Sequence, residues 1–129
     1  MQDEPRPSEI LGAVAAFLRG AATKESGPHI AFQLRVAGNA LEIAQRGLDL
    51  APAAEAEELA RLKGLLGRDG TLPELNAALA LAIRAGEIDL TTPGLSDHLW
   101  ATTMAKLAID QPNYTGYRAA LADRAAKHQ

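Results

Sequence analysis

The sequence contains no cysteine, few aromatic residues and no long apolar run. Without cysteine, the chain cannot form disulfide bonds, use a thiolate nucleophile or hold zinc through cysteine ligands. Aromatic residues make up only 4% of the 129 residues, so large rings contribute little to a core. The longest apolar run, residues 77–83, is too short to cross a bilayer as a helix, and we therefore expect no membrane partner.

Clusters of basic residues are also missing. The net charge is −3 and no short window is dominated by lysine and arginine, so we expect no nucleic-acid partner. Residues 1–5 are acidic and turn-prone, which is the reverse of the basic and then apolar start of a signal peptide. Together these features favour a cytoplasmic protein.

Alanine and leucine, by contrast, are abundant, with 27 and 19 residues. Both residues favour helices, and the sequence predicts an all-α fold, a compact antiparallel bundle of five main helices with a short C-terminal helix. We expect a single helical domain, residues 1–129, with an ordered core at about residues 8–118. The predicted helices, bounded by caps, prolines and glycines, cover residues 8–20, 29–50, 52–67, 71–86 and 92–111, with a weaker one at 118–129.

Particular residues set these boundaries. Ser8 is placed as the N-cap of the first helix, and Pro52 as the first residue of the third, because proline fits the first turn of a helix. Thr71, followed three residues later by a glutamate, predicts a capping box. Thr92 and its following proline predict the start of the fifth helix, which must end before Pro112.

The helix at residues 29–50 has the strongest apolar pattern. One row of residues recurs at alternating four- and three-residue steps, and a second row widens the apolar arc beyond half the circumference. A peripheral helix would not need so wide an arc, so we expect this helix to be central and the most buried. The two rows are Ile30, Leu34, Ala37, Leu41, Ala44 and Leu48, and Phe32, Val36, Ala40 and Ile43.

Motifs that carry chemistry are absent from the sequence. It contains no phosphate-binding loop, no nucleophile elbow and no metalloprotease or di-iron motif. Gly64, Gly67 and Gly70 are interpreted as a helix end and a turn, because no strand precedes them. We therefore assign no catalytic residue, no metal ligand and no cofactor.

Two sets of polar residues are candidates for a ligand or partner site. On helix 29–50, Asn39 lies at the edge of the apolar arc, where a buried amide needs hydrogen-bond partners. Arg35, one turn earlier, could join Asn39 in binding the backbone of a neighbouring helix, a partner or a ligand carboxylate. On helix 92–111, a polar row runs between apolar residues, and its histidine could act as a base and its lysine as an anion anchor. The interpretation we favour is structural: the histidine is an interhelical residue with its hydrogen bonds satisfied, and Lys106 and Asp110 form an ion pair within the helix. The row is His98, Thr102, Lys106 and Asp110.

The segment after this helix and the tail complete the candidates. Because Pro112 ends the helix, we expect residues 110–118 to form an ordered wrap that either closes the core or presents Tyr114, Tyr117 and Arg118 to a partner. The tail has alanines that one small domain does not bury, and we expect them to pack in a homodimer.

Three segments resemble a bacterial family classed as a domain of unknown function. They are KLAIDQPNY at residues 106–114, FxxRVAxNAL at 32–41 and PxxxExLxAVxxFL at 5–18, and the likeness extends over residues 5–118. Members of this family tend to be encoded beside aminoglycoside-phosphotransferase-like kinases and acyl-CoA dehydrogenases. The resemblance implies a catabolic context and no site residue.

Two functions stay open at this point. The first is a non-catalytic accessory protein that binds a kinase-like or acyl-CoA dehydrogenase-like enzyme. The second is a domain that binds an anionic metabolite, such as an acyl-CoA derivative, at the polar row of helix 92–111 with Arg35 and Arg118. A pocket shared by Asn39, His98 and Lys106 would favour the second function.

Overall fold

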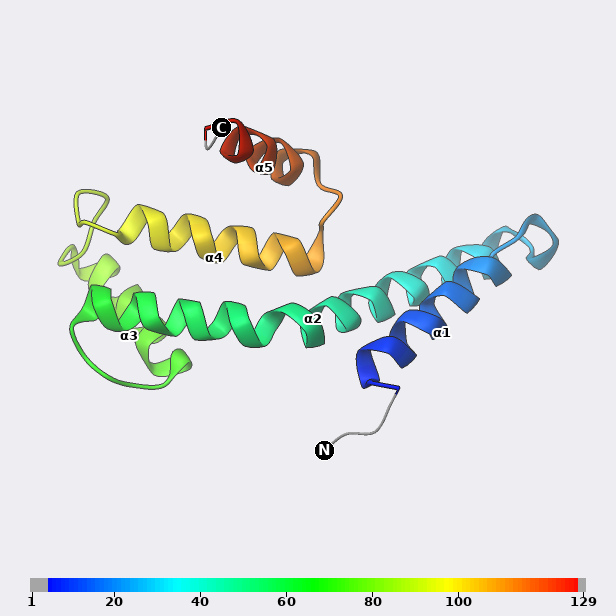
Figure 1. Cartoon of the computed structure of the whole chain (residues 1–129), viewed down its shortest axis with the longest axis horizontal. Helices are drawn as coiled ribbons and strands as arrows, with labels where there is room; N and C mark the ends of the chain where they lie inside the picture. Colours follow the sequence, from blue (N-terminus) through cyan, green and yellow to red (C-terminus); the bar gives the residue numbers. More distant parts are fainter. Residues whose placement is uncertain (1–4, 128–129) are drawn as a thin grey trace. The chain divides into compact units, whose positions relative to one another are not determined.

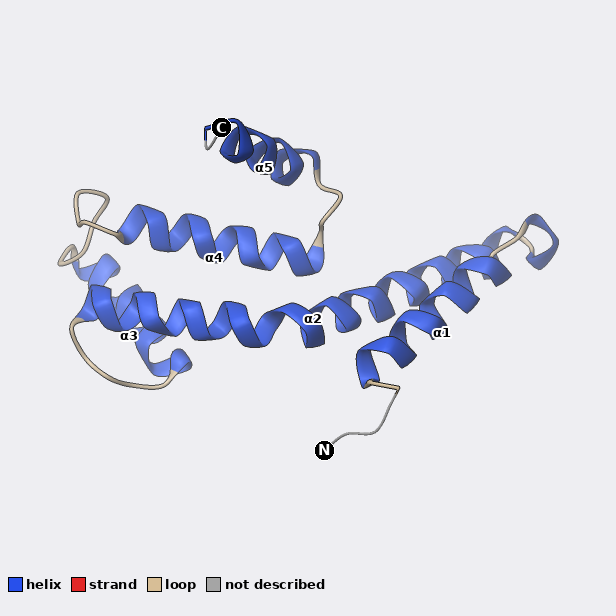
Figure 2. Cartoon of the chain, in the orientation of Figure 1, coloured by secondary structure: helices blue, strands red, loops and turns tan. Residues whose placement is uncertain are grey.

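The protein is all-α (Figures 1 and 2). A computed structural model describes residues 5–127, so residues 1–4, on which the expectation about a signal peptide rests, and residues 128–129 lie outside it. Residues 5–127 contain no strand, and a short 3-10 helix at Lys24–Ser26 follows the first α-helix. The five α-helices are α1 (Pro7–Ala21), α2 (Pro28–Leu66), α3 (Leu72–Ala85), α4 (Leu95–Asp110) and α5 (Thr115–Lys127). The predicted fold class is confirmed, and in the described part of the chain no helix is both long and apolar enough to span a membrane.

The helices predicted at residues 29–50 and 52–67 are a single helix, α2, so the predicted break at Pro52 is wrong. A proline within a helix removes one backbone hydrogen bond and costs about 3 kcal/mol. The surrounding sequence, APAAEA at residues 51–56, consists otherwise of strong helix formers, and these continue the helix through the proline.

Two other helix starts differ from the prediction. Helix α1 begins at Pro7, because the Glu9 carboxylate accepts a 2.7 Å hydrogen bond from the Arg6 backbone N–H, and Ser8 lies buried inside the helix. Helix α4 begins at Leu95, since Gly94 adopts a φ of 86°, which a right-handed helix cannot include.

The other predicted ends are confirmed. The Thr71 backbone N–H donates to the Glu74 carboxylate at 2.9 Å, which forms the expected capping contact of α3. Gly67 and Gly86 adopt positive φ values directly after α2 and α3, as glycines that end helices do. Helix α4 ends at Asp110, before Pro112.

The chain divides into two compact units, residues 1–51 and 52–129. In the first unit, α1 and the first part of α2 form an antiparallel hairpin. The helices approach closely at Ala15 and Gly38, where a Cβ added to the glycine would lie 3.6 Å from the Ala15 carbonyl oxygen. Small residues at this contact allow the two backbones to come together.

Helix 29–50 is not the most buried helix, contrary to the prediction. The residues that α2 turns toward α1 are the small Ala31 and Gly38, whereas Ile30, Phe32 and Leu48 are exposed. The apolar arc is as wide as the sequence indicates, but one partner helix covers only a narrow part of it. Much of the hairpin's apolar surface is therefore uncovered.

The core of the protein lies in the second unit. Leu62 of α2, Leu75 and Leu79 of α3, and Leu95 of α4 form a buried cluster. Four partly buried residues pack around it, namely Leu59, Leu66, Leu72 and Ile88. Leucines of the final turns of α2, together with those of α3 and α4, thus organise the fold.

Helix α5 runs beside α4, to which it is linked by residues 111–114 (Figure 1). The helix expected at residues 118–129 is confirmed over residues 118–127 and begins earlier, at Thr115, whereas residues 128–129 lie outside the described residues. The wrap predicted for residues 110–118 is instead a short turn and the first turn of α5. Its residues are mostly exposed, so this segment does not close the core.

Candidate functional site

Polar side chains gather in the second unit where α2, α3 and α4 meet. Asn76 of α3 donates a 2.8 Å hydrogen bond to the Glu58 carboxylate of α2. Arg61, one turn further along α2, lies 3.5 Å from the Thr102 hydroxyl of α4 and 3.9 Å from the Glu57 carboxylate. His98 of α4 is coupled electrostatically to both Arg61 and Glu58. We call these residues the α2–α4 polar cluster.

His98 is the most deeply buried member of this cluster. His98 is 2% exposed, and its Nδ1 has no hydrogen-bond partner among the residues that the structure describes. Burial, aided by the positive charge of Arg61, lowers the pKa of His98 below its ordinary value of 6.5, while Glu58 acts in the opposite direction. The imidazole is therefore neutral at pH 7, and because Nδ1 has no partner among residues 5–127, His98 is not the satisfied interhelical histidine that the sequence predicts.

A pocket of about 310 Å³ opens beside His98, between α3 and α4. Thr102 and Lys106, from the next two turns of α4, line it together with Asn76 of α3. Its apolar wall consists of Leu79, Ile83 and Leu99. The structure thus brings three residues of the predicted polar row into one concavity.

The fourth residue of the row, Asp110, does not belong to this pocket. It is exposed at the end of α4, and within residues 5–127 it forms no ion pair with Lys106. The ion pair considered from the sequence is therefore absent from the described structure.

The burial of His98 leads to a testable prediction about how the stability of the protein depends on pH. Because the folded state holds His98 with a lowered pKa, the unfolded chain binds more protons at acid pH. The stability that neutral His98 contributes is present above about pH 6.5 and is lost as the pH falls below that value. We expect urea unfolding between about pH 7.5 and 5.5 to show a steeper loss of stability in the wild type than in His98→Gln.

Nuclear magnetic resonance gives an independent measurement of the pKa of His98. Titration of the His98 ring protons in the wild type should give an apparent pKa below 6.5. Parallel stability profiles for wild type and variant, together with an unshifted titration, would contradict the prediction.

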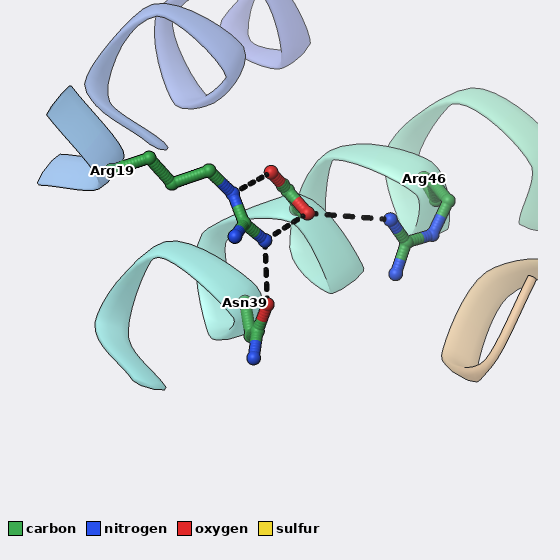
Figure 3. A network of polar contacts seen from close by, with 4 residues as sticks. Arg19, Asn39 and Arg46 are labelled. Carbon is green, nitrogen blue, oxygen red and sulfur yellow. Dashed lines mark hydrogen bonds and ion pairs between the residues drawn. The ribbon is translucent and has the colours of Figure 1, made fainter. Parts of the chain in front are cut away.

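The other candidate residues of helix 29–50 lie in the first unit. Arg19 of α1 donates to the Asn39 side-chain oxygen at 2.6 Å and to both carboxylate oxygens of Glu42, at 2.5 and 2.8 Å (Figure 3). The Arg46 guanidinium lies 4.0 Å from the same carboxylate. Asn39 thus finds the partner that its position requires, and the network ties the two helices of the hairpin together.

These contacts shift the titration of both partners. The hydrogen bond from Arg19 lowers the pKa of the Glu42 carboxyl and raises the pKa of the guanidinium. Both side chains are partly exposed, so solvent screens the pair and it adds little stability. Arg35 is not part of the network and lines a separate pocket of about 320 Å³ beside residues 22–24.

The remaining candidates lie around the start of α5. Tyr114 and Arg118 are exposed and Tyr117 is half-buried. None of the three lines the pocket beside His98. The nine predicted site residues therefore separate into a pocket in the second unit, a network and a pocket in the first, and an exposed segment near α5.

Sequence reasoning missed the partners of this site on α2 and α3. Glu58 and Arg61 look like an ordinary solvated pair in a helix, and only the packing of α4 makes them part of a cluster. Asn76 offered a signal, since it is the one amide in an otherwise alanine- and leucine-rich helix. Among the described residues, no group of histidines and carboxylates could hold a metal ion.

The comparisons with known proteins assign no chemistry to this chain. The chain matches the family described as "Domain of unknown function (DUF6285)" over residues 24–114, which is more than half of its length, and it belongs to that family. The matched region runs from the 3-10 helix to Tyr114, so it holds α2, α3, α4 and the polar cluster. Neither the search of curated proteins nor that of solved structures gave a match.

Proposed function

We propose that the protein is an accessory interaction protein that binds a partner enzyme through its hairpin of α1 and α2. The observation that carries this proposal is the uncovered apolar face of the hairpin. Its exposed large apolar residues are Val14, Ile30 and Leu48. Contiguous apolar surface of this kind is a feature of protein interaction sites.

The apolar residues lie on one side of the hairpin for a geometric reason. Positions 12, 15 and 19 of α1 meet α2, and positions 31, 38 and 42 of α2 are turned toward α1. In each helix the residue just before such a position lies about 100° to one side of it. Because the helices are antiparallel, these preceding residues share one face. They are Leu11, Val14 and Leu18 in α1 and Ile30, Ala37 and Leu41 in α2.

The opposite face, which we call the polar face, carries the network of Arg19, Asn39 and Glu42 (Figure 3) beside the exposed Phe32 and Val36. The apolar face has no charged residue among the six that define it. A partner can therefore cover it without removing a charge from water, which would be costly.

The resemblance of the sequence supports a particular class of partner. Relatives encoded beside aminoglycoside-phosphotransferase-like kinases and acyl-CoA dehydrogenases favour one of these enzymes as the protein that the hairpin binds. In this proposal residues 1–129 act as one non-catalytic module of a bacterial, cytoplasmic catabolic system. The expected homodimer belongs to the same proposal, because most of the tail alanines, including Ala119 and Ala125, are exposed on α5.

Two single substitutions in α2 test the binding face. Ile30 lies on the apolar face and is 53% exposed, whereas Phe32 lies toward the polar face and is 59% exposed. Both are within the first turns of α2, where aspartate is compatible with the helix. We expect Ile30→Asp to weaken the complex with the co-expressed enzyme at least about ten-fold, and Phe32→Asp to leave it nearly unchanged.

The measurement is co-purification followed by titration with the purified enzyme, with light scattering of the chain alone to give its own oligomeric state. No complex with either enzyme class, or equal loss with both variants, would refute the proposal. Binding that depends on Ile30 and not on Phe32 supports it.

The pocket beside His98 favours a second candidate function, the binding of a small organic anion. Lys106 supplies a positive charge at the pocket, Thr102 and Asn76 supply hydrogen bonds, and the volume of about 310 Å³ suits a short carboxylate or the acyl part of an acyl-CoA. Lys106→Gln separates the two candidates, because it changes this pocket and leaves the hairpin untouched.

A further inference from the structure

A second and larger hollow lies in the second unit, where α5 meets α4 and the final turns of α2. Its volume is about 750 Å³, which is in the range of pockets that hold small organic ligands. It differs from the pocket beside His98, and no residue of the predicted polar row lines it. We call it the α4–α5 pocket.

One wall of this pocket is the Trp100 ring. The residue is 55% exposed, although tryptophan is among the side chains that gain most from burial. The lining from α5 includes the small residues Gly116, Ala119 and Ala120. The exposed face of the indole, beside these small residues, offers a planar ring a surface on which to stack.

Three cations line the same pocket. Arg61 projects from α2, and its Nε is buried with no hydrogen-bond partner among the described residues. Arg124 and Lys127 come from successive turns of α5, and within residues 5–127 neither forms an ion pair. Two guanidiniums and an ammonium offer the several donors that the oxygens of a phosphate accept.

Two carboxylates, Asp97 and Asp123, also line the pocket. They would disfavour a simple anion, but they accept hydrogen bonds from hydroxyl and amino groups. A ligand that satisfies all of these groups has a planar ring, several hydroxyl or amino donors, and a phosphate. We propose that the α4–α5 pocket binds a nucleoside phosphate, with the base on Trp100 and the phosphate near Arg61 and Arg124. This inference goes beyond the proposed function and does not depend on it.

The chain offers a direct reporter for this test, because Trp100 is its only tryptophan. Titration of the full chain with AMP should quench the tryptophan fluorescence in a saturable way. Adenosine and inorganic phosphate, which each carry only part of the recognised chemistry, should need at least about ten-fold higher concentrations for half-saturation. If phosphate alone binds as well as AMP, or if no compound gives a saturable change, the proposal is wrong.

A pair of matched variants assigns the binding to this pocket. Arg124→Gln removes one pocket cation from the exposed side of α5, and Arg84→Gln removes an exposed cation from the last turn of α3, outside the pocket. We expect Arg124→Gln to raise the AMP concentration at half-saturation about ten-fold and Arg84→Gln to leave it within about two-fold. Circular dichroism of both variants checks that the helices are retained. An equal effect of the two substitutions would overturn the assignment, since it would indicate a general response to charge.

Discussion

Replacing Leu62 by alanine is expected to lower the free energy of unfolding by about 2–5 kcal/mol. Leu62 is 0% exposed and lies in the buried cluster with Leu75, Leu79 and Leu95, to which α2, α3 and α4 all contribute. Truncation of its side chain leaves a cavity, and residues of three helices would have to move together to fill it. A loss of this size is a large part of the total stability of a small domain.

Urea unfolding followed by circular dichroism measures this effect. Leu81→Ala is the matched control, because Leu81 is on α3, which also contributes Leu75 and Leu79, but is 66% exposed and outside the cluster. Its substitution should change the free energy of unfolding by less than about 0.5 kcal/mol. If Leu62→Ala costs no more than Leu81→Ala, the cluster is not the core.

The sequence predicted the helices better than it predicted their packing. Caps and glycines act within a few residues of where they stand, so the pattern at Thr71 and the turn at Gly86 could be identified from local sequence alone. Pro52 shows the limit of local rules. A proline fits both the first turn of a new helix and, at a cost, the interior of a long one, and the flanking alanines decide between them.

Burial was harder to predict, because an apolar arc says only what a helix could bury. Helix 29–50 has the widest arc, yet its close contact with α1 is made through Ala15, Ala31 and Gly38. A contact between small residues brings backbones together and leaves the larger side chains on either side. The core instead formed around the sparser leucines of residues 59–66.

The candidate site was predicted in part for a similar reason. The spacing of His98, Thr102 and Lys106 places them on one side of one helix, and all three line a pocket. The residues that complete the site, Arg61 and Asn76, come from other helices, and no spacing within the sequence relates them to His98.

The close approach in the hairpin leads to a second stability prediction, at Gly38 of α2. A Cβ at this position would lie 3.4 Å from the Arg19 Cγ and 3.6 Å from the Ala15 carbonyl oxygen, which are ordinary contact distances. Gly38→Ala should therefore fit and stabilise the hairpin by about 0.5–1 kcal/mol, because alanine favours the helix more than glycine does. A leucine has three more carbon atoms, for which this buried contact offers no space, so Gly38→Leu should cost about 1–3 kcal/mol.

Hydrogen exchange of the α1 backbone amides measures this effect locally, since separation of the two helices would expose α1 first. Gly47→Leu is the matched control, because Gly47 is in the same helix and a Cβ there has no neighbouring atom within 4 Å. We expect faster exchange in α1 for Gly38→Leu, slower exchange for Gly38→Ala and no acceleration for Gly47→Leu. Opposite changes in the α1 exchange rate for Gly38→Ala and Gly38→Leu distinguish a steric contact from a general sensitivity of α2 to substitution. Equal acceleration of exchange by Gly38→Leu and Gly47→Leu would show that the helices do not meet at Gly38.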